Sequence, residues 1–119
     1  MELMVVLSIV SILVTLSYPS YVSFVRKADR ADARGELLDW ANRQEIWRAD
    51  HITYNADINP ANTENYTYTI TNLTPASFTL TATAIGGQAN DKEDGVSCLT
   101  LTLEQDGIQG PSGHLECWG

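Results

Sequence analysis

Two different periods of apolar residues divide the chain. Residues 3–25 form a nearly continuous apolar run that contains no Asp, Glu, Lys or Arg. Residues 26–50 keep good helix formers, and their apolar side chains recur mostly every three or four positions, at Ala28, Ala31, Leu37, Leu38, Trp40, Ala41 and Trp47. We therefore expect one helix over residues 2–49, about 70 Å long at 1.5 Å per residue. Its first half is apolar all round and its second half is amphipathic.

Two residues of the apolar run argue against a simple membrane anchor. The run is long enough to cross a bilayer, which takes about 20 apolar residues. However, Glu2 places a carboxylate at its start, where water is favoured over lipid. Pro19 removes a backbone donor and clashes with the carbonyl of Thr15, which predicts a helix kink. The run also lacks the basic start and small-residue cleavage site of a secretory signal.

Beyond Asp50 the apolar pattern changes to a period of two. Residues 55–65 are polar and predict a loop, whereas residues 66–71, 78–84 and 98–103 alternate Thr with apolar or aromatic side chains and predict strands. Residues 104–107 (Glu-Gln-Asp-Gly) indicate a hairpin turn. Short connections favour an antiparallel meander. The second half of the long helix is the only segment large enough to cover that sheet.

The expected fold class is therefore α+β, a long N-terminal helix packed on a small antiparallel sheet. We divide the chain into residues 1–25, an apolar transmembrane or filament-core helix half, and residues 26–119, the head domain. The head domain includes the amphipathic half of the helix.

Charge is spread unevenly over these parts. The chain has 15 acidic and 7 basic residues, for a net charge of −8. Six of the basic residues lie in residues 26–48, whereas residues 49–119 contain nine acids and only Lys92. An extended nucleic-acid groove needs clustered Lys and Arg. The charge therefore indicates no nucleic-acid contact.

Cys98 and Cys117 are the only cysteines of the chain. The 18 residues between them match no zinc or Cys-x-x-Cys redox spacing. We predict a disulfide, and with it an oxidising compartment outside the cytoplasm. Two buried free thiols are the alternative.

No pattern in the chain supports catalysis or metal binding. No Ser, Cys or Lys nucleophile has a base within a recognisable motif, so we predict no enzyme activity and no cofactor. His51 and His114 have no metal-ligand spacing around them. The acidic segment 91–95 fails the Asp-x-Asp/Asn-x-Asp/Asn-Gly pattern of calcium loops, and we interpret it as a solvated loop without metal. The tryptophans are expected to pack in the core and at interfaces: Trp40, Trp47 and Trp118.

The segment "ELMVVLSIVSILVTLSYPSYVSFVRKADRADA" resembles the N-terminus of type IV pilins. Mature chains of that family begin Phe-Thr-Leu-Ile-Glu-Leu and continue with an apolar run and a Tyr-Pro-x-Tyr element. Glu2 matches the family's glutamate, and Tyr18, Pro19 and Tyr21 match the second element. Most of the remaining chain is similar to the minor pilins that end in Cys-Trp, as residues 117–118 do here.

This resemblance implies the pilin fold and a role as structural subunit of a type IV pilus. A minor pilin of this kind supports pilus assembly, twitching motility, adhesion or DNA uptake. It is held in the inner membrane of a Gram-negative bacterium and then extracted into an extracellular filament. Its partners are other pilin subunits, which it meets through the N-terminal helices. The resemblance assigns Glu2 to assembly, paired with the N-terminal amine of an adjacent subunit.

The printed sequence departs from the family at its front. The family's basic leader, the glycine before the cut and the Phe-Thr-Leu-Ile segment are absent, and Met1 stands where the isoleucine would be. Prepilin peptidase is therefore expected as a partner only if a leader exists upstream.

Two other functions remain as alternatives at this stage. One is a pseudopilin of a type II secretion system, which has the same architecture. The other is a membrane-anchored periplasmic binding module that never assembles. Glu2 and the Tyr-Pro-x-Tyr element argue against the second, because an anchor needs neither.

Overall fold

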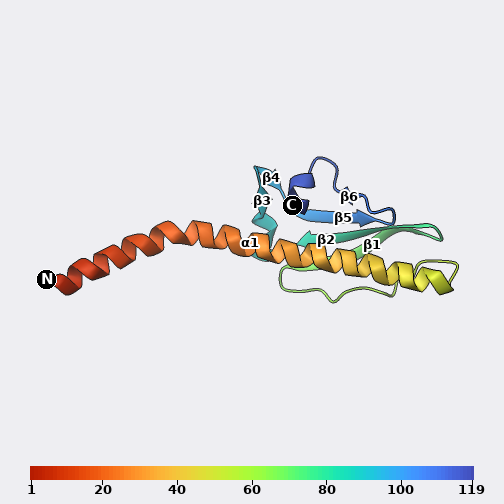
Figure 1. Ribbon diagram of the computed structural model, residues 1–119, viewed down its shortest axis with the longest axis horizontal. Coiled ribbons are helices and arrows are strands. Elements are labelled where there is room, and N and C mark those ends of the chain that lie inside the picture. Colours follow the sequence, from red (N-terminus) through yellow and green to blue (C-terminus); the bar gives the residue numbers. More distant parts are fainter.

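One long helix and a small antiparallel sheet make up the computed structural model (Figure 1). It describes the side chains of residues 1–15 and 21–119, and helix α1 (Glu2–Asp50) runs through the whole first part of the chain. The molecule measures 75 × 26 × 19 Å, because α1 extends far beyond the sheet. The fold class is the predicted α+β. Tyr18 and the predicted kink at Pro19 lie outside the described residues.

Helix α1 begins and ends within a residue of its predicted bounds. It ends where His51 adopts an extended conformation (φ −133°), with the His51 N–H donating to the carbonyl of Arg48 (3.4 Å). The second half of α1 lies along the sheet, whereas the first half projects away from it (Figure 1).

A narrow stripe of the second half of α1 faces the sheet. The buried residues follow a spacing of three and four: Arg30, Ala33, Leu37, Trp40 and Gln44. Two members of this stripe are polar, which the apolar pattern could not indicate. Conversely, Ala28, Ala31 and Leu38, which belong to the sequence pattern, are exposed, because they lie on other sides of the helix.

The main sheet is the predicted antiparallel meander. Its strands are β1 (Tyr66–Thr74), β2 (Ser77–Ala84), β5 (Thr100–Glu104) and β6 (Gln109–Gly110), in the order β1-β2-β5-β6. Alternate side chains of the first three strands are buried beneath α1: Tyr66, Tyr68, Phe78, Leu80, Ala82, Ala84, Leu101 and Leu103. The Thr residues between them point to the other face, so the period of two predicted the buried face correctly.

A small insertion separates β2 from β5. It contains the 3-10 helix η1 (Gly86–Asn90) and a hairpin of β3 (Lys92–Glu93) and β4 (Val96–Ser97). Asp94 and Gly95 form its two-residue turn with φ of 51° and 79°, a conformation that Asp-Gly favours. The interpretation of residues 91–95 as a solvated loop was therefore wrong.

The third predicted strand starts too early, at residue 98 instead of Thr100. The Cys98 N–H donates to the carbonyl of Asp91 (2.9 Å), outside the main sheet, so the ladder with β2 begins only two residues later. The turn predicted at residues 104–107 is present, with the Gly107 N–H donating to the carbonyl of Glu104 (2.9 Å). The chain then passes through β6 to a final 3-10 helix, η2 (Leu115–Trp118).

Candidate functional site

The first half of α1 presents a bare apolar surface. Its large apolar side chains are 50–74% exposed: Leu3, Met4, Val5, Val6, Leu7, Ile9, Val10, Ile12, Leu13 and Val14. Hydroxyl groups in this stretch donate back to carbonyls one turn earlier, Ser8 to Met4 (3.0 Å) and Ser11 to Leu7 (2.9 Å). Their polar atoms are thus satisfied within the helix, which makes this surface compatible with an apolar environment.

Glu2 lies in the first turn of α1, where the helix dipole favours a negative charge. Within the part of the chain that the structure describes, its carboxylate has no ion pair. On either side of residues 16–20, no described helical segment is both long and apolar enough to cross a membrane.

A buried charge cluster joins the second half of α1 to the β3–β4 hairpin. Arg30 donates to Asp91 Oδ2 (2.8 Å) and to Glu93 Oε2 (2.6 Å), and Lys27 lies 3.9 Å from the same Glu93 oxygen. Gln88 of η1 adds a link, since its amide donates to the carbonyl of Arg26 (2.8 Å) and to the Tyr66 hydroxyl (3.0 Å). These contacts fix the insertion against the helix.

The pKa values of the two acids in this cluster, Asp91 and Glu93, are shifted in opposite directions. Burial raises the pKa of Asp91, although the neighbouring Arg30 guanidinium opposes that shift. Hydrogen bonding to Arg30, together with the charge of Lys27, lowers the pKa of the half-buried Glu93 carboxyl. Burial also raises the pKa of the Tyr66 hydroxyl to about 12. Because Arg30 and Lys27 together balance the charges of Asp91 and Glu93, the cluster is a structural connection between the helix and the insertion.

The disulfide between Cys98 and Cys117 closes the C-terminal region next to this cluster. Both sulfurs are buried, and Arg30 Nη1 lies 3.4 Å from Cys98 Sγ. The Arg34 guanidinium donates to the carbonyl of Trp118, whose indole N–H donates to the carbonyl of Gly110 (2.9 Å). The end of the chain is therefore tied to α1 and to β6.

The two histidines take structural positions. His51 stacks on Trp47 (ring centroids 3.6 Å apart), and His114 Nδ1 contacts the carbonyl of Ser97 (2.8 Å). Among the tryptophans, Trp40 is buried in the core against Tyr68, whereas Trp47 and Trp118 are half-buried. Among the described residues, no group of three His, Cys, Asp or Glu side chains could hold a metal ion.

The loop between α1 and β1 is held by polar residues of the buried stripe. Gln44 forms a reciprocal pair with the backbone of Asn55, donating to its carbonyl (2.5 Å) and accepting from its N–H (2.9 Å). The Trp40 indole donates to the carbonyl of Ile58. Near the end of the loop, Thr63 Oγ1 accepts from the N–H groups of Tyr66 (3.1 Å) and Asn65 (3.3 Å).

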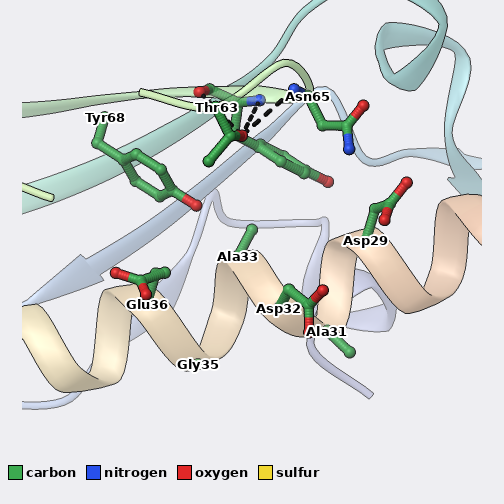
Figure 2. A pocket seen from close by; sticks show the side chains of 10 residues that line it. Asp29, Ala31, Asp32, Ala33, Gly35, Glu36, Thr63, Asn65 and Tyr68 are labelled. Atoms are coloured by element: carbon green, nitrogen blue, oxygen red, sulfur yellow. Dashed lines mark hydrogen bonds between the residues drawn. The ribbon is translucent and has the colours of Figure 1, made fainter. Parts of the chain in front are cut away.

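This loop and α1 enclose a groove of about 540 Å³ (Figure 2). Three carboxylates from one side of the helix line it: Asp29, Asp32 and Glu36. Thr63 and Asn65 stand opposite them, and the Tyr68 hydroxyl points in from β1 (Figure 2). Burial raises the pKa of Tyr68, and the charges of Glu36 and Asp32 raise it further. The groove is thus lined by three acidic side chains and by no lysine or arginine.

The fold and the bare apolar half of α1 together define a pilin. A solved structure of a type IV pilin from Shewanella oneidensis matches with a TM-score of 0.65 and 25% sequence identity, covering 79% of this chain and 98% of that one. Comparison with curated proteins finds no significant match.

A family profile then places the chain more narrowly. The family described as "Type IV minor pilin ComP, DNA uptake sequence receptor" matches residues 19–102, well over half of the chain. The chain belongs to this family of type IV minor pilins. It is therefore a pilus subunit rather than a secretion pseudopilin or an unassembled binding module, and its family is structural rather than enzymatic.

Sequence reasoning missed the residues that hold the head domain together. Arg30, Gln44 and Gln88 are buried polar side chains whose partners lie far away in the sequence, so no local pattern marks them. The hairpin of β3 and β4 was predictable from the sequence, because the Asp94-Gly95 pair favours a two-residue hairpin turn. From the sequence, this acidic segment was tested only as a calcium loop.

Proposed function

We propose that this chain enters the type IV pilus through residues 1–25 of α1, which lie in the filament core beside the corresponding helices of other pilins. The observation that carries this proposal is the exposure of residues 3–14 of α1, whose large apolar side chains are at least half exposed. Burying such side chains gains roughly 25 cal/mol per Å² of apolar surface. Neighbouring helices of the same kind supply that burial.

Before assembly, the same segment lies in the inner membrane. Residues 3–25 carry no ionisable Asp, Glu, Lys or Arg, and the hydroxyls of Ser8, Ser11 and Thr15 are satisfied by their own helix. Both properties suit lipid and a packed helical core alike. If a leader precedes Met1, prepilin peptidase is the partner that removes it.

Within the filament, Glu2 pairs with the N-terminal amine of an adjacent subunit. An ionised carboxylate at the start of an apolar segment is expensive in lipid or in a packed core unless it is paired. Pairing between subunits offsets that cost and sets the axial register of neighbours. Pro19 is proposed to kink α1 between its two halves.

Quantifying the subunit in sheared pili and in membranes tests this role. Glu2→Val, made in the full natural precursor, should leave membrane abundance and head folding unchanged but remove most of the subunit from pili. Asp57→Val, which changes an exposed carboxylate of the head away from both hollows beside α1, is the control and should enter pili normally. Unchanged pilus content of Glu2→Val would reject the pairing.

The proposed division into residues 1–25 and 26–119 has its own test. Residues 26–119 contain the buried stripe of α1, the sheet and the disulfide, and none of the described residues of segment 1–25 belongs to the core. The truncated chain should therefore be soluble, monomeric and folded, with helix and strand signals in circular dichroism. Aggregation or loss of the strand signal would contradict the division.

We propose DNA uptake as the behaviour of the pilus that this subunit supports, because the matching family is described as a DNA uptake sequence receptor. The acidic head still predicts no extended DNA groove. Several basic side chains already have partners: Lys27 and Arg30 with Glu93, Arg34 with the carbonyl of Trp118, and Arg43 with Asp39.

Two measurements separate a subunit of the uptake pilus from a receptor. Deleting the subunit should lower natural transformation, and DNA uptake unaffected by the deletion would contradict the proposed behaviour. Purified full chain in detergent should show no saturable duplex binding at physiological salt. Saturable, sequence-dependent binding would instead assign the receptor role to this chain.

A further inference from the structure

The acidic groove beside α1 has an electrostatic imbalance that the free subunit does not resolve. Asp29, Asp32 and Glu36 lie at intervals of three and four residues on one side of the helix (Figure 2). Within the described residues, none of the three has an ion pair or a hydrogen bond through its side chain. Like charges at this spacing destabilise a helix by a few tenths of a kcal/mol per pair.

The Tyr68 hydroxyl is a second, independent sign of a missing partner. Tyr68 is only 8% exposed, and its ring packs edge-on against Trp40 (centroids 6.4 Å apart). Its hydroxyl nevertheless points into the groove (Figure 2) and has no hydrogen bond among the described residues. The ring is therefore fixed by the core, and its hydroxyl is free to bond an occupant that enters the groove.

The spacing of the carboxylates suggests the chemistry of that occupant. Asp29 and Glu36 are seven residues apart, which places them roughly 10 Å from each other along the helix axis. They do not form a group that could hold one metal ion. A long side chain with a cationic end can reach several carboxylates and leave its methylene groups against apolar surface.

An apolar hollow continues the groove toward the first half of α1. It has a volume of about 290 Å³, shares Asp29 and Asn65 with the acidic groove, and is lined by Tyr21, Val22 and Val25. Arg26 also lines this hollow, but it forms no ion pair with Asp29 among the described residues. The hollow therefore connects the carboxylates with the part of the helix that we propose to lie among other pilins. A neighbouring subunit in the filament is in position to reach it.

We propose that the groove of Asp29, Asp32, Glu36 and Tyr68 receives a lysine or arginine side chain of a neighbouring pilin subunit. This inference rests on the proposed assembly of the chain into a pilus. The cation offsets part of the negative charge of the three carboxylates, and the Tyr68 hydroxyl accepts a hydrogen bond from the same cationic group. The first half of α1 supplies apolar burial, and this groove supplies a charge-specific contact between heads.

Substitutions without charge test the groove in the full natural precursor. Asp32→Asn/Glu36→Gln should lower the ratio of subunit in pili to subunit in membranes at least fivefold, and Asp32→Lys/Glu36→Lys should lower it further. Asp39→Asn/Glu45→Gln changes the net charge equally on the same helix but outside the groove, and should stay within twofold of wild type. Equal ratios for the groove variant and this control would overturn the proposal.

Tyr68→Phe separates the groove from the fold, because it removes one oxygen and keeps the buried ring. Since the hydroxyl has no partner within the described subunit, unfolding stability should be unchanged or slightly higher. Incorporation into pili should fall two- to threefold. Unchanged incorporation at unchanged stability would show that the hydroxyl contacts no neighbour and would count against the proposal.

A photoreactive residue in place of Asn65 identifies the occupant in intact pili. The expected cross-link joins position 65 to a peptide of another pilin that contains Lys or Arg. Cross-links only to peptides without a basic residue would overturn the proposal, as would loss of wild-type incorporation on chelation of divalent cations. Absence of the wild-type subunit from pili would instead reject the proposed assembly itself, and Glu2→Val measured alongside keeps the two failures distinct.

Discussion

The two halves of α1 share one helix and differ in what covers them. In residues 3–14 of the first half the large apolar side chains are exposed on all sides of the helix, whereas in the second half a single stripe is buried on the sheet. Isolated helices gain little stability from propensity alone, so each half needs a partner surface. The second half finds its partner within the chain. The first half lacks one, and this difference identifies the surface that acts between molecules.

Polar residues show the same contrast. In the first half, Ser8, Ser11 and Thr15 donate to carbonyls of their own helix, and Glu2 is the one acidic or basic side chain of the sequence there. The second half buries Arg30 and Gln44, which hold other segments of the chain. Specific polar contacts thus organise the head domain. The first half of α1 instead offers an apolar surface, whose burial against other pilins requires no specific polar contacts.

The largest effect is expected when the buried charge cluster is broken. Arg30→Met leaves Asp91 buried without its cation and should lower the free energy of unfolding by about 3–5 kcal/mol. The deficit should shrink as pH falls, because protonation neutralises the abandoned carboxylate. Arg43→Met breaks only the exposed pair with Asp39 and should cost less than about 1 kcal/mol. Urea denaturation in detergent measures both, and equal costs would contradict the role of Arg30.

One substitution made twice compares the two halves directly. Leu37 is fully buried, so Leu37→Ala should lower the free energy of unfolding by about 2–5 kcal/mol. Leu7 is exposed, so Leu7→Ala should change it by less than about 0.5 kcal/mol. Incorporation into pili should show the reverse order when corrected for folded protein. A stability cost for Leu7→Ala comparable with that of Leu37→Ala would refute the division of the helix.

Alkaline pH should lower the free energy of unfolding of the head domain through the Tyr66 hydroxyl, which is buried beneath the second half of α1. The pKa of Tyr66 is about 12 in the folded chain against an ordinary value of 10, because of burial. The unfolded chain therefore loses this proton first, and stability should fall as pH rises from 10 to 12. Tyr66→Phe should reduce that slope without abolishing it, since burial also raises the pKa of Tyr54 and Tyr68. A slope identical to wild type would contradict the assignment.

The smallest expected effect concerns Gly35, which interrupts the second half without a reason inside the subunit. A methyl group at this position would meet no atom within 4 Å. Gly35→Ala should therefore raise the free energy of unfolding by about 0.5–1 kcal/mol through helix propensity. Thermal unfolding followed at 222 nm measures the change, and a lower midpoint would reveal a contact that the structure does not show.

Patterns with a local cause were predictable from the sequence, and contacts between distant residues were not. Helix α1, the buried faces of β1 and β2 and the antiparallel order follow from periodicity, which each segment carries by itself. Arg30 and Asp91 are 61 positions apart in the sequence, so their buried contact depends on the chain folding back, and neither residue type indicates burial. The acidic groove could not be predicted for the same reason, because Tyr68 lies near Asp32 and Glu36 only in the folded chain.

Photocross-linking from the first half of α1 tests the central claim most directly. A photoreactive residue replaces Ile9, an exposed position, in the natural precursor, and intact pili are irradiated. We predict a product larger by one pilin subunit, with the link inside the apolar helix segment of that neighbour. A subunit that sediments with pili but links only to lipid, or only to the head domain of another pilin, would contradict the claim that this half lies in the filament core.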